Sequence, residues 1–540
     1  MRRLYLIAAI ASLGIAANAT TIDTATTPDT KTVQKADTDV EGVEINGFEC
    51  NLHADGTFTI TGITSVSSEE LVVPYTVTYE GKEYHCETIN IYYLQGPKSG
   101  NAGGETKITP YIKSVVFSDG IKTLKGQFYL CYCKKVTIPK SVSFIEYTAF
   151  NGIIDSGHED EVETPYWQEL GANFKAYDLE EFIVDKDNMN YTAKDGLLYT
   201  KDMKMLISCP RGKRGVIAIP EGVETLANAS FGICNRLTEI QLPSTIRKIG
   251  YGYGRYAGFH YCLNLEKVNI PEGVETLEAG TFRNCHKLTS ITLPKSLKYL
   301  DLNYKRDEND TRQIEVFGPM YSLKELNMED TGIETIEGVY YESGYGTTPF
   351  AAPIPLENLR LPKNIKVIGK NAFYGVNPPT ELHLPATIES LGEKFIDPFR
   401  SYDVRNMSRA TTKQTESRIK DIYCYWTTPL EVADNIFGYV KVKENGKTKE
   451  VFPQEWADIC TLHVPAGTMA AYRANAVWGK FKNIVEFTPS GIDAVKDNTA
   501  DWSASGIYTL QGVKVAESKA QAATLPSGIY IVNGKKIVKG

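Results

Sequence analysis

The chain has 540 residues, and 58 Lys and Arg against 66 Asp and Glu give it a formal net charge of −8. At about 150 residues per domain this length predicts three or four globular domains, unless the chain is an array that grows by adding repeated units. The acidic balance offers no basic field for nucleic acid, so a nucleic-acid partner is not expected.

The first 19 residues have the pattern of a secretory signal peptide. Arg2 and Arg3 precede an apolar run from Leu4 to Ala17, and Ala17-Asn18-Ala19 is a small-x-small cleavage sequence. The alternative is that this segment stays as an anchor. No later run of about 18 apolar residues follows, so we expect no membrane span after the signal is removed.

Residues 20–40 and 41–111 are expected to precede the main array. The first stretch is threonine-rich with hardly any large apolar side chains, which predicts a disordered leader. In the second, alternating apolar residues surround the turns Ala54-Asp55-Gly56 and Glu80-Gly81-Lys82, which predicts two hairpins. We assign 41–111 to an N-terminal β-hairpin cap, because the first unit of a stacked array must cover an open core.

A repeated unit dominates residues 112–487. Leu265-x-x-Val268-x-Ile270-Pro271 returns 23 residues later as Leu288-x-x-Ile291-x-Leu293-Pro294. The period of two predicts a short strand with one buried face, and proline, which lacks a ladder donor, ends it. One unit cannot bury its own apolar face, so the units must stack. The sequence therefore predicts a mainly β solenoid of about a dozen units, with a curved parallel sheet and an irregular or short-helical convex side.

Three further segments complete the predicted organisation. Gly467–Trp478 has few helix breakers and predicts a short helix that closes the last core layer. Residues 488–505 are polar with Pro and Gly, as in a linker, and 506–540 return to strand-like alternation.

Cysteines recur inside the repeats. Cys234, Cys262 and Cys285 occupy one repeat position, which predicts a ladder of small apolar side chains. Cys50 and Cys86 lie outside this ladder and are the one pair to test as a disulfide, since exported proteins can form them.

The units, written LP-x-x-[IL]-x-x-I-G-x-x-x-F-x-x-C-x-x-L, resemble the BspA-type leucine-rich repeats of bacterial surface proteins over about residues 110–487. The segment around Asp195-Gly196 resembles the hairpin-bearing variant unit of that family. Residues 506–540 are similar to the C-terminal sorting domains of type IX secretion. The matching positions are Gly506, Tyr508, Gly512, Val515, Gly528, Tyr530 and Val532. The alternative for this tail is one more small β module with no export role.

Motifs for catalysis, metals and cofactors do not appear. None of the seven histidines has zinc-site spacing, and neither a G-x-S-x-G nor a Walker sequence occurs. Cys285 and His286 are adjacent, but Cys285 occupies a buried ladder position and adjacent side chains point apart. We therefore expect no enzyme activity, no cofactor and no metal.

The outward residues of the strands are the candidate binding surface. They alternate with the buried positions and carry mixed charge with uncharged polar groups. The predicted ligand-binding set combines outward residues of adjoining strands with tyrosines of the loop Gly250–Gly258: Glu239, Gln241, Lys267, Asn269, Tyr251, Tyr253 and Tyr256. Tyrosine suits such a role because its ring both stacks and hydrogen-bonds. The alternatives are a plain solvated sheet and tyrosines packed on the solenoid flank.

The resemblance implies an adhesin-like role at the cell surface or outside the cell. The sequence therefore predicts an exported, monomeric, non-enzymatic protein that presents a repeat surface to an extracellular protein ligand. The alternative is a glycan-binding accessory protein of polysaccharide capture.

Overall fold

The computed structural model describes most of the chain between residues 39 and 488 and short strands after it. The described ranges, apart from a few single positions, are 39–91, 112–126, 132–147, 178–250, 258–303, 314–340, 346–350, 354–373, 376–398, 417–438, 440–444, 447–488, 507–508, 514–516, 528–532 and 535–539. The predicted signal peptide, most of the leader and most of the linker lie outside these residues.

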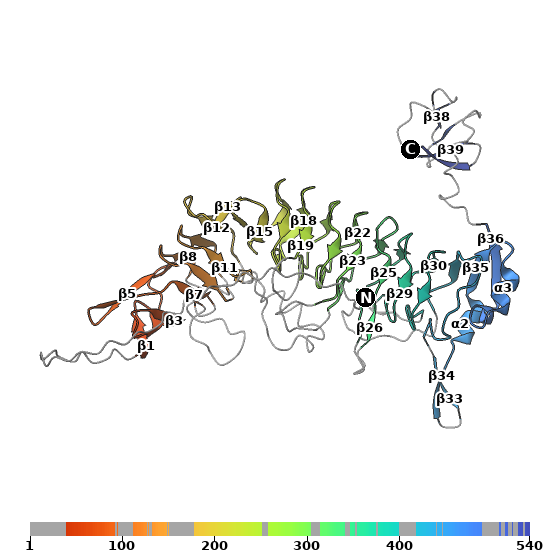
Figure 1. Cartoon of the computed structure of the whole chain (residues 1–540), viewed down its shortest axis with the longest axis horizontal. Helices are drawn as coiled ribbons and strands as arrows, with labels where there is room; N and C mark the ends of the chain where they lie inside the picture. Colours follow the sequence, from red (N-terminus) through yellow and green to blue (C-terminus); the bar gives the residue numbers. More distant parts are fainter. Residues whose placement is uncertain are drawn as a thin grey trace, which may run out of the picture.

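Parallel strands of two to five residues stand side by side along an elongated array (Figure 1). We call them the long-strand ladder. They are β4 Glu70–Val73, β8 Ser114–Phe117, β10 Lys135–Ile138, β12 Glu181–Val184, β16 Gly215–Ala218, β18 Leu237–Gln241, β20 Lys267–Val268, β22 Ser290–Thr292, β24 Glu325–Asn327, β28 Asn358–Arg360, β30 Glu381–Leu384, β32 Asp421–Cys424, β35 Thr461–Pro465 and β36 Asn483–Phe487. The predicted solenoid with a parallel sheet is confirmed.

The register of this ladder keeps apolar residues on one side of every strand. Ile291 pairs with Leu326, and Leu326 with Leu359, so each buried side chain lies beside its counterpart in the next unit. All three are at most 5% exposed. Since successive strand residues point to opposite faces, the neighbours of these residues point outward in equally regular columns.

The opposite side of the array adds detail to the predicted irregular convex side. It carries a second set of parallel strands of two or three residues, the short-strand ladder. These are β7 Thr88–Asn90, β9 Thr123–Lys125, β11 Phe144–Ile145, β17 Thr225–Leu226, β19 Lys248–Ile249, β21 Thr276–Leu277, β23 Tyr299–Leu300, β25 Thr335–Ile336, β29 Val367–Ile368 and β31 Ser390–Leu391. Each of these strands has one inward apolar residue, such as the buried Leu277 of β21. Thr276 and Leu277 pair with Tyr299 and Leu300 of the next unit.

Antiparallel strands begin the described chain. The strands β1 Val40–Ile45, β2 Phe48–Leu52 and β3 Phe58–Ile63 form one sheet, and β5 Thr76–Tyr79 pairs with β6 Lys82–His85. Between them, β4 already pairs in parallel with β8. The first strand of the array therefore lies at Glu70, inside the stretch 41–111 that the sequence assigns to the cap.

A hairpin divides the interior of the array into two cores. The strands β13 Tyr191–Lys194 and β14 Leu197–Thr200 turn at Asp195 and Gly196, whose φ angles of 53° and 79° suit a tight hairpin turn, and β15 Met205–Ser208 follows. Alternate residues face opposite ways. Leu198 packs in the N-terminal core, and Leu197 and Tyr199 pack in the C-terminal core.

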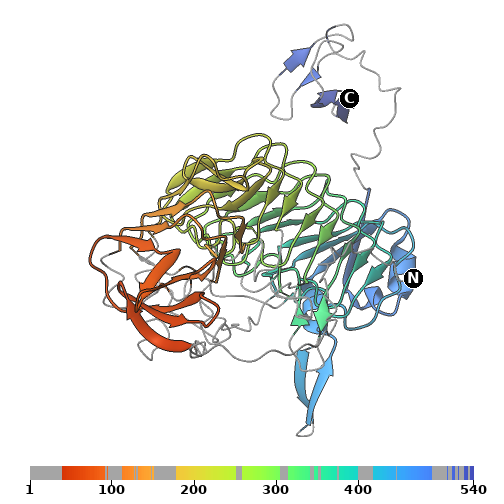
Figure 2. The ribbon, with the colours of Figure 1, turned by 60° about the vertical axis from the view of Figure 1, so that its left-hand side comes forward.

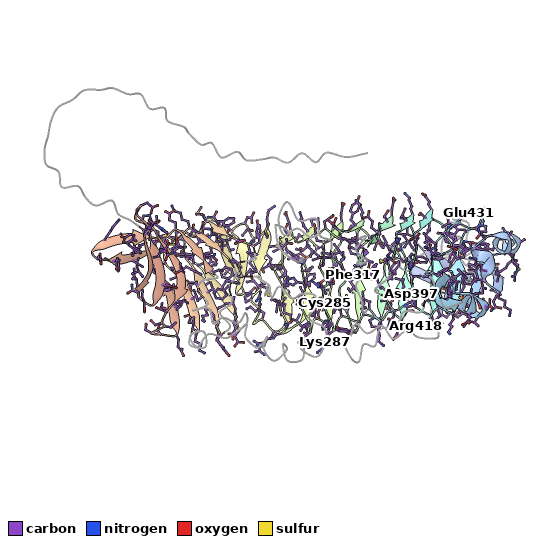
Figure 3. All side chains as sticks on the ribbon, turned by 90° about the horizontal axis from the view of Figure 1, so that it is seen from below. Cys285, Lys287, Phe317, Asp397, Arg418 and Glu431 are labelled. Atoms are coloured by element: carbon purple, nitrogen blue, oxygen red, sulfur yellow. The ribbon has the colours of Figure 1, made fainter. Side chains whose placement is uncertain are left out.

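Two columns of side chains run through the C-terminal core. Six phenylalanines lie ring beside ring, with centroids 5.0–5.6 Å apart; they are Phe231, Phe259, Phe282, Phe317, Phe350 and Phe373. The predicted cysteine ladder is buried, and its thiols bond between units: Cys262 donates to Phe231 O at 3.1 Å and Cys285 to Phe259 O at 3.2 Å. Figure 3 places Cys285 and Phe317 inside the array and Lys287 at its margin.

The C-terminal end of the array is closed by helices and large rings. The helices are α2 Gln454–Ile459, α3 Met469–Ala474 and the 3-10 helix η4 Trp478–Lys480. Trp456, Tyr472, Trp478 and Phe481 are buried there, so α3 and η4 cover the last core layer near the predicted helix.

Two hairpins and a separate tail sheet complete the described strands. They are β26 Val339–Tyr340 with β27 Gly346–Thr347, β33 Val440–Glu444 with β34 Lys447–Val451, and the antiparallel set β37 Ile507–Tyr508, β38 Lys514–Ala516, β39 Gly528–Val532 and β40 Lys535–Lys539. The β33–β34 hairpin projects from the array (Figure 2).

Leu277→Ala or Ile291→Ala should lower the free energy of unfolding by about 2–5 kcal/mol, because each side chain fills a layer shared by neighbouring units. Chemical denaturation measures the loss. Ser290→Ala, on the outward side of β22, is the matched control and should change little. Equal effects of Ile291→Ala and Ser290→Ala would contradict the register.

Candidate binding face

The outward residues of the long-strand ladder form two columns over the described strands. Along the first column Glu239 pairs with Lys267, Ser290 with Glu325, and Glu325 with Asn358. Along the second, Thr292 pairs with Asn327 and Asn327 with Arg360. The predicted alternation of outward polar and inward apolar residues therefore holds from strand to strand.

Three of the predicted ligand-binding residues form one connected patch on β18 and β20. Lys267 Nζ lies 3.0 Å from Glu239 Oε1, and Gln241 Nε2 donates to the same oxygen at 2.9 Å. The hydrogen bonds from Gln241 and Lys267 lower the pKa of the Glu239 carboxyl from its usual value. The Lys267 side chain is 71% exposed, so this patch presents a cation beside a partly covered carboxylate.

Asn269, the fourth predicted residue on these strands, has a different bonding pattern. Its Oδ1 accepts from the Leu242 backbone N–H at 2.9 Å, and its Nδ2 donates to Leu242 O at 3.0 Å. The Asn269 side chain thus bonds to the backbone of the neighbouring unit just after β20, which ends at Val268. Both of its polar groups are engaged before any ligand arrives.

The loop tyrosines of the prediction, Tyr251, Tyr253 and Tyr256, lie outside the described residues. The described residues on either side of them are Gly250 and Gly258. Glu239 and Lys267 lie on the strands before and after this loop, on the long-strand side.

The adjacent Cys285 and His286 do not resemble an activated pair. Burial raises the pKa of the Cys285 thiol well above its usual value and lowers the pKa of His286 to about 4. Both groups are thus held neutral, whereas a catalytic pair of this kind needs a thiolate beside a cationic ring. Across the described ranges, no three His, Cys, Asp or Glu side chains gather in a way that could hold a metal ion.

Cys50 and Cys86 do not form a disulfide in this structure. Both cysteines, the pair to be tested as a disulfide, are buried free thiols. Cys86 donates to Thr88 O at 3.1 Å. Burial raises the pKa of Cys50 to about 12 and that of Cys86 to about 11.

A cluster of rings at the end of the face was missed by the sequence reasoning. His383, Tyr423 and His463 occupy the same outward position on β30, β32 and β35, and their rings stack at 4.4 and 4.1 Å between centroids. The signal was available in the motif, because each ring lies between two buried residues of its strand. A 40-residue spacing with an intervening hairpin obscured it.

The longest helices of the described residues have six residues, too few to cross a bilayer.

Comparison with known sequences finds one repeat family that is similar to parts of the chain. A family profile described as "BspA type Leucine rich repeat region (6 copies)" matches over residues 106–156, 214–305, 254–337 and 346–417. No curated protein sequence matches this chain.

Several solved structures are similar at low sequence identity. A leucine rich cell surface protein from Faecalibacterium prausnitzii is 16% identical; the match covers 55% of this chain and 90% of that protein, with a TM-score of 0.30. The pneumococcal vaccine antigen PcpA is 14% identical; the match covers 84% of this chain and 100% of that protein, with a TM-score of 0.31. A leucine-rich repeat protein from Bacteroides ovatus is 17% identical; the match covers 83% of this chain and 100% of that protein, with a TM-score of 0.30.

Lys267→Ala and Gln241→Ala should each change the free energy of unfolding by less than about 0.5 kcal/mol, because exposed pairs contribute little. Asn269→Ala should cost about 1–2 kcal/mol, since two bonds to the Leu242 backbone are lost. Guanidinium denaturation compares the three variants. If Asn269→Ala were as neutral as the other two, Asn269 would not have the structural role assigned here.

Proposed function

We propose that the chain is an exported cell-surface protein whose repeat surface binds an extracellular protein in an adhesin-like role, without catalysis. The match to the BspA-type leucine-rich repeat profile supports this proposal. The single observation that carries the proposal is the in-register outward face of the long-strand ladder. Strands about 4.8 Å apart give a face of fourteen strands a length of roughly 60 Å, which suits an extended partner.

The composition of this face favours a protein partner. The first column mixes both signs of charge with uncharged polar groups, since Glu239 and Lys267 are followed by Ser290, Glu325 and Asn358, so these strands carry no single-sign field. A patterned charge surface selects among partners through complementary potentials more than through overall attraction. The exposed Lys267 and its partner Glu239 form the centre of the proposed site, with Gln241 beside them, Asn269 fixing the local backbone, and Tyr251, Tyr253 and Tyr256 contributed by the loop.

Exchanging the charges of one pair tests this site. The double variant Glu239→Lys/Lys267→Glu keeps a possible ion pair but inverts the pattern that a partner meets. We expect binding to a responsive member of a panel of extracellular matrix proteins, measured by surface plasmon resonance, to weaken at least about tenfold, or 1.4 kcal/mol, with unchanged thermal unfolding.

The control exchanges a pair on the other side of the array. Lys366 Nζ and Glu334 Oε2, 2.8 Å apart, lie beside the short-strand ladder, and Glu334→Lys/Lys366→Glu should bind normally. Replacing Tyr251, Tyr253 and Tyr256 by Ala should weaken binding similarly, whereas replacing Tyr340, Tyr341 and Tyr345 should not. A loss confined to the control variants would move the site away from β18 and β20.

Export is the second part of the proposal. Residues 1–19 would direct the chain across the inner membrane, and 506–540 would act as a type IX sorting domain. The tail strands β37 to β40 pair only with one another among the described residues, as expected for a module that the solenoid does not need.

Deleting residues 506–540 should leave the thermal unfolding of the solenoid unchanged and cause the protein to accumulate in the periplasm. Cell fractionation and surface labelling of the deletion and full-length chains measure the outcome. Normal surface display of the shortened chain would refute the sorting role and favour a β module with no part in export.

A further inference from the structure

The last four strands of the long-strand ladder carry a cluster of rings on their outward face. His383, Tyr423 and His463 stack with interplanar angles of 3° and 8°. Phe487 lies edge-to-face with Tyr423 at 5.5 Å and with Tyr425 at 5.3 Å between centroids. We call these five residues the ring ladder.

We propose that the ring ladder is a binding site for a neutral polysaccharide. This inference goes beyond the proposed protein-binding role, because it concerns β30, β32, β35 and β36 rather than the patch on β18 and β20. Failure of either proposal leaves the other intact.

The rings are local to this end of the array. The corresponding outward column on β18 to β28, with the position just after β20, carries polar side chains, namely Gln241, Asn269, Thr292, Asn327 and Arg360. The change to three successive rings is therefore not a requirement of the repeat, since the same strand geometry is met elsewhere without them.

The ring ladder does not fill the core. Leu382, Ile422 and Leu462, which alternate with the rings, are the buried residues of these strands. The His383 side chain is 44% exposed and that of His463 18%. The Tyr423 hydroxyl makes no hydrogen bond to any described residue. The cluster thus presents polar ring edges to solvent.

Hydrogen bonds hold the outer rings in place. His463 Nε2 donates to Asp421 Oδ1 at 2.8 Å, and His383 Nδ1 lies 3.0 Å from the Tyr425 hydroxyl. Rings fixed in this way lose little further conformational entropy when a ligand binds, which reduces the cost of association. Stacking between rings adds to this rigidity.

The polar groups around the rings select the class of ligand. The carboxylates of Glu381 and Asp421 flank the stack and would repel phosphates and acidic sugars. They also accept hydrogen bonds from hydroxyl groups, beside the hydroxyl of Tyr423, which both donates and accepts. Neutral pyranose sugars combine apolar C–H faces with a rim of hydroxyls, so they match a site that joins flat rings with mixed donors and acceptors.

The dimensions favour a chain over a single sugar. Four adjacent parallel strands span about 14 Å between the first and the last. The site lies on an open face, where one sugar would gain few contacts. Several consecutive sugar units would meet the rings and both carboxylates together.

Affinity gel electrophoresis of the full mature chain tests the proposal, with a neutral β-glucan, xylan, galactomannan and α-glucan as probes. We expect retardation by at least one of them. Tyr423→Ala should weaken that binding at least tenfold, and Tyr423→Phe, which keeps the stack and removes only the hydroxyl, should weaken it less. Asn327→Ala, at the equivalent position of β24, is the matched control and should bind normally.

Three outcomes would overturn the proposal. None of the four probes binds; or Tyr423→Ala, with unchanged thermal unfolding, binds as well as the parent chain; or Tyr423→Ala and Asn327→Ala weaken binding equally. An arginine-rich peptide that binds at the ring ladder and is displaced by about 0.5 M salt, while no polysaccharide binds, would assign the site to protein recognition instead.

Discussion

Each repeat depends on its neighbours because one unit supplies only a single layer of the core, and the two units beside it cover that layer. The inward residues of a strand meet their counterparts one unit away, as Ile291 meets Leu326, and the phenylalanine column joins six successive units. The thiol of Cys285 reaches back to the carbonyl of Phe259 for its acceptor. Stability in such an array accumulates between nearest neighbours, and the outward columns are regular because the inward ones must be.

The same constraint explains the two ends and the middle. At the C-terminal end Trp456 and Trp478 cover the last layer of the described array. In the middle, the hairpin of β13 and β14 has apolar residues on both faces. The same sheet therefore covers the end of the N-terminal core and the beginning of the C-terminal core. The chain thereby changes core without exposing an apolar layer.

The sequence predicted the parts of the fold that follow from period two and from proline. Val268 and Ile270 before Pro271 were enough to place a strand, its buried side and its outward neighbours Lys267 and Asn269. It did not predict the short-strand ladder, because the two residues Thr276 and Leu277 are too few to show a period. The sequence also did not predict that the hairpin separates two cores. Leu197 and Leu198 are adjacent apolar residues, and only the folded chain shows that they pack in different cores.

The candidate site was predictable only as a surface. Alternation placed Glu239, Gln241, Lys267 and Asn269 on one face, but it could not distinguish Lys267, which is exposed, from Asn269, whose amide is bound to the Leu242 backbone. The stacking of Tyr423 on two histidines depends on the alignment of β30, β32 and β35 across long connections. The motif places each ring at an outward position, but the long connections hide that the three strands are neighbours.

The partition between the two cores has a mechanical consequence for a protein held at one end. Under tension, one half of the array can peel unit by unit while the hairpin keeps the core of the other half covered. A released unit of 23 residues lengthens the chain by up to about 75 Å, because an extended residue spans about 3.3 Å. The array would then act as an extensible tether that yields in small steps rather than breaking at once.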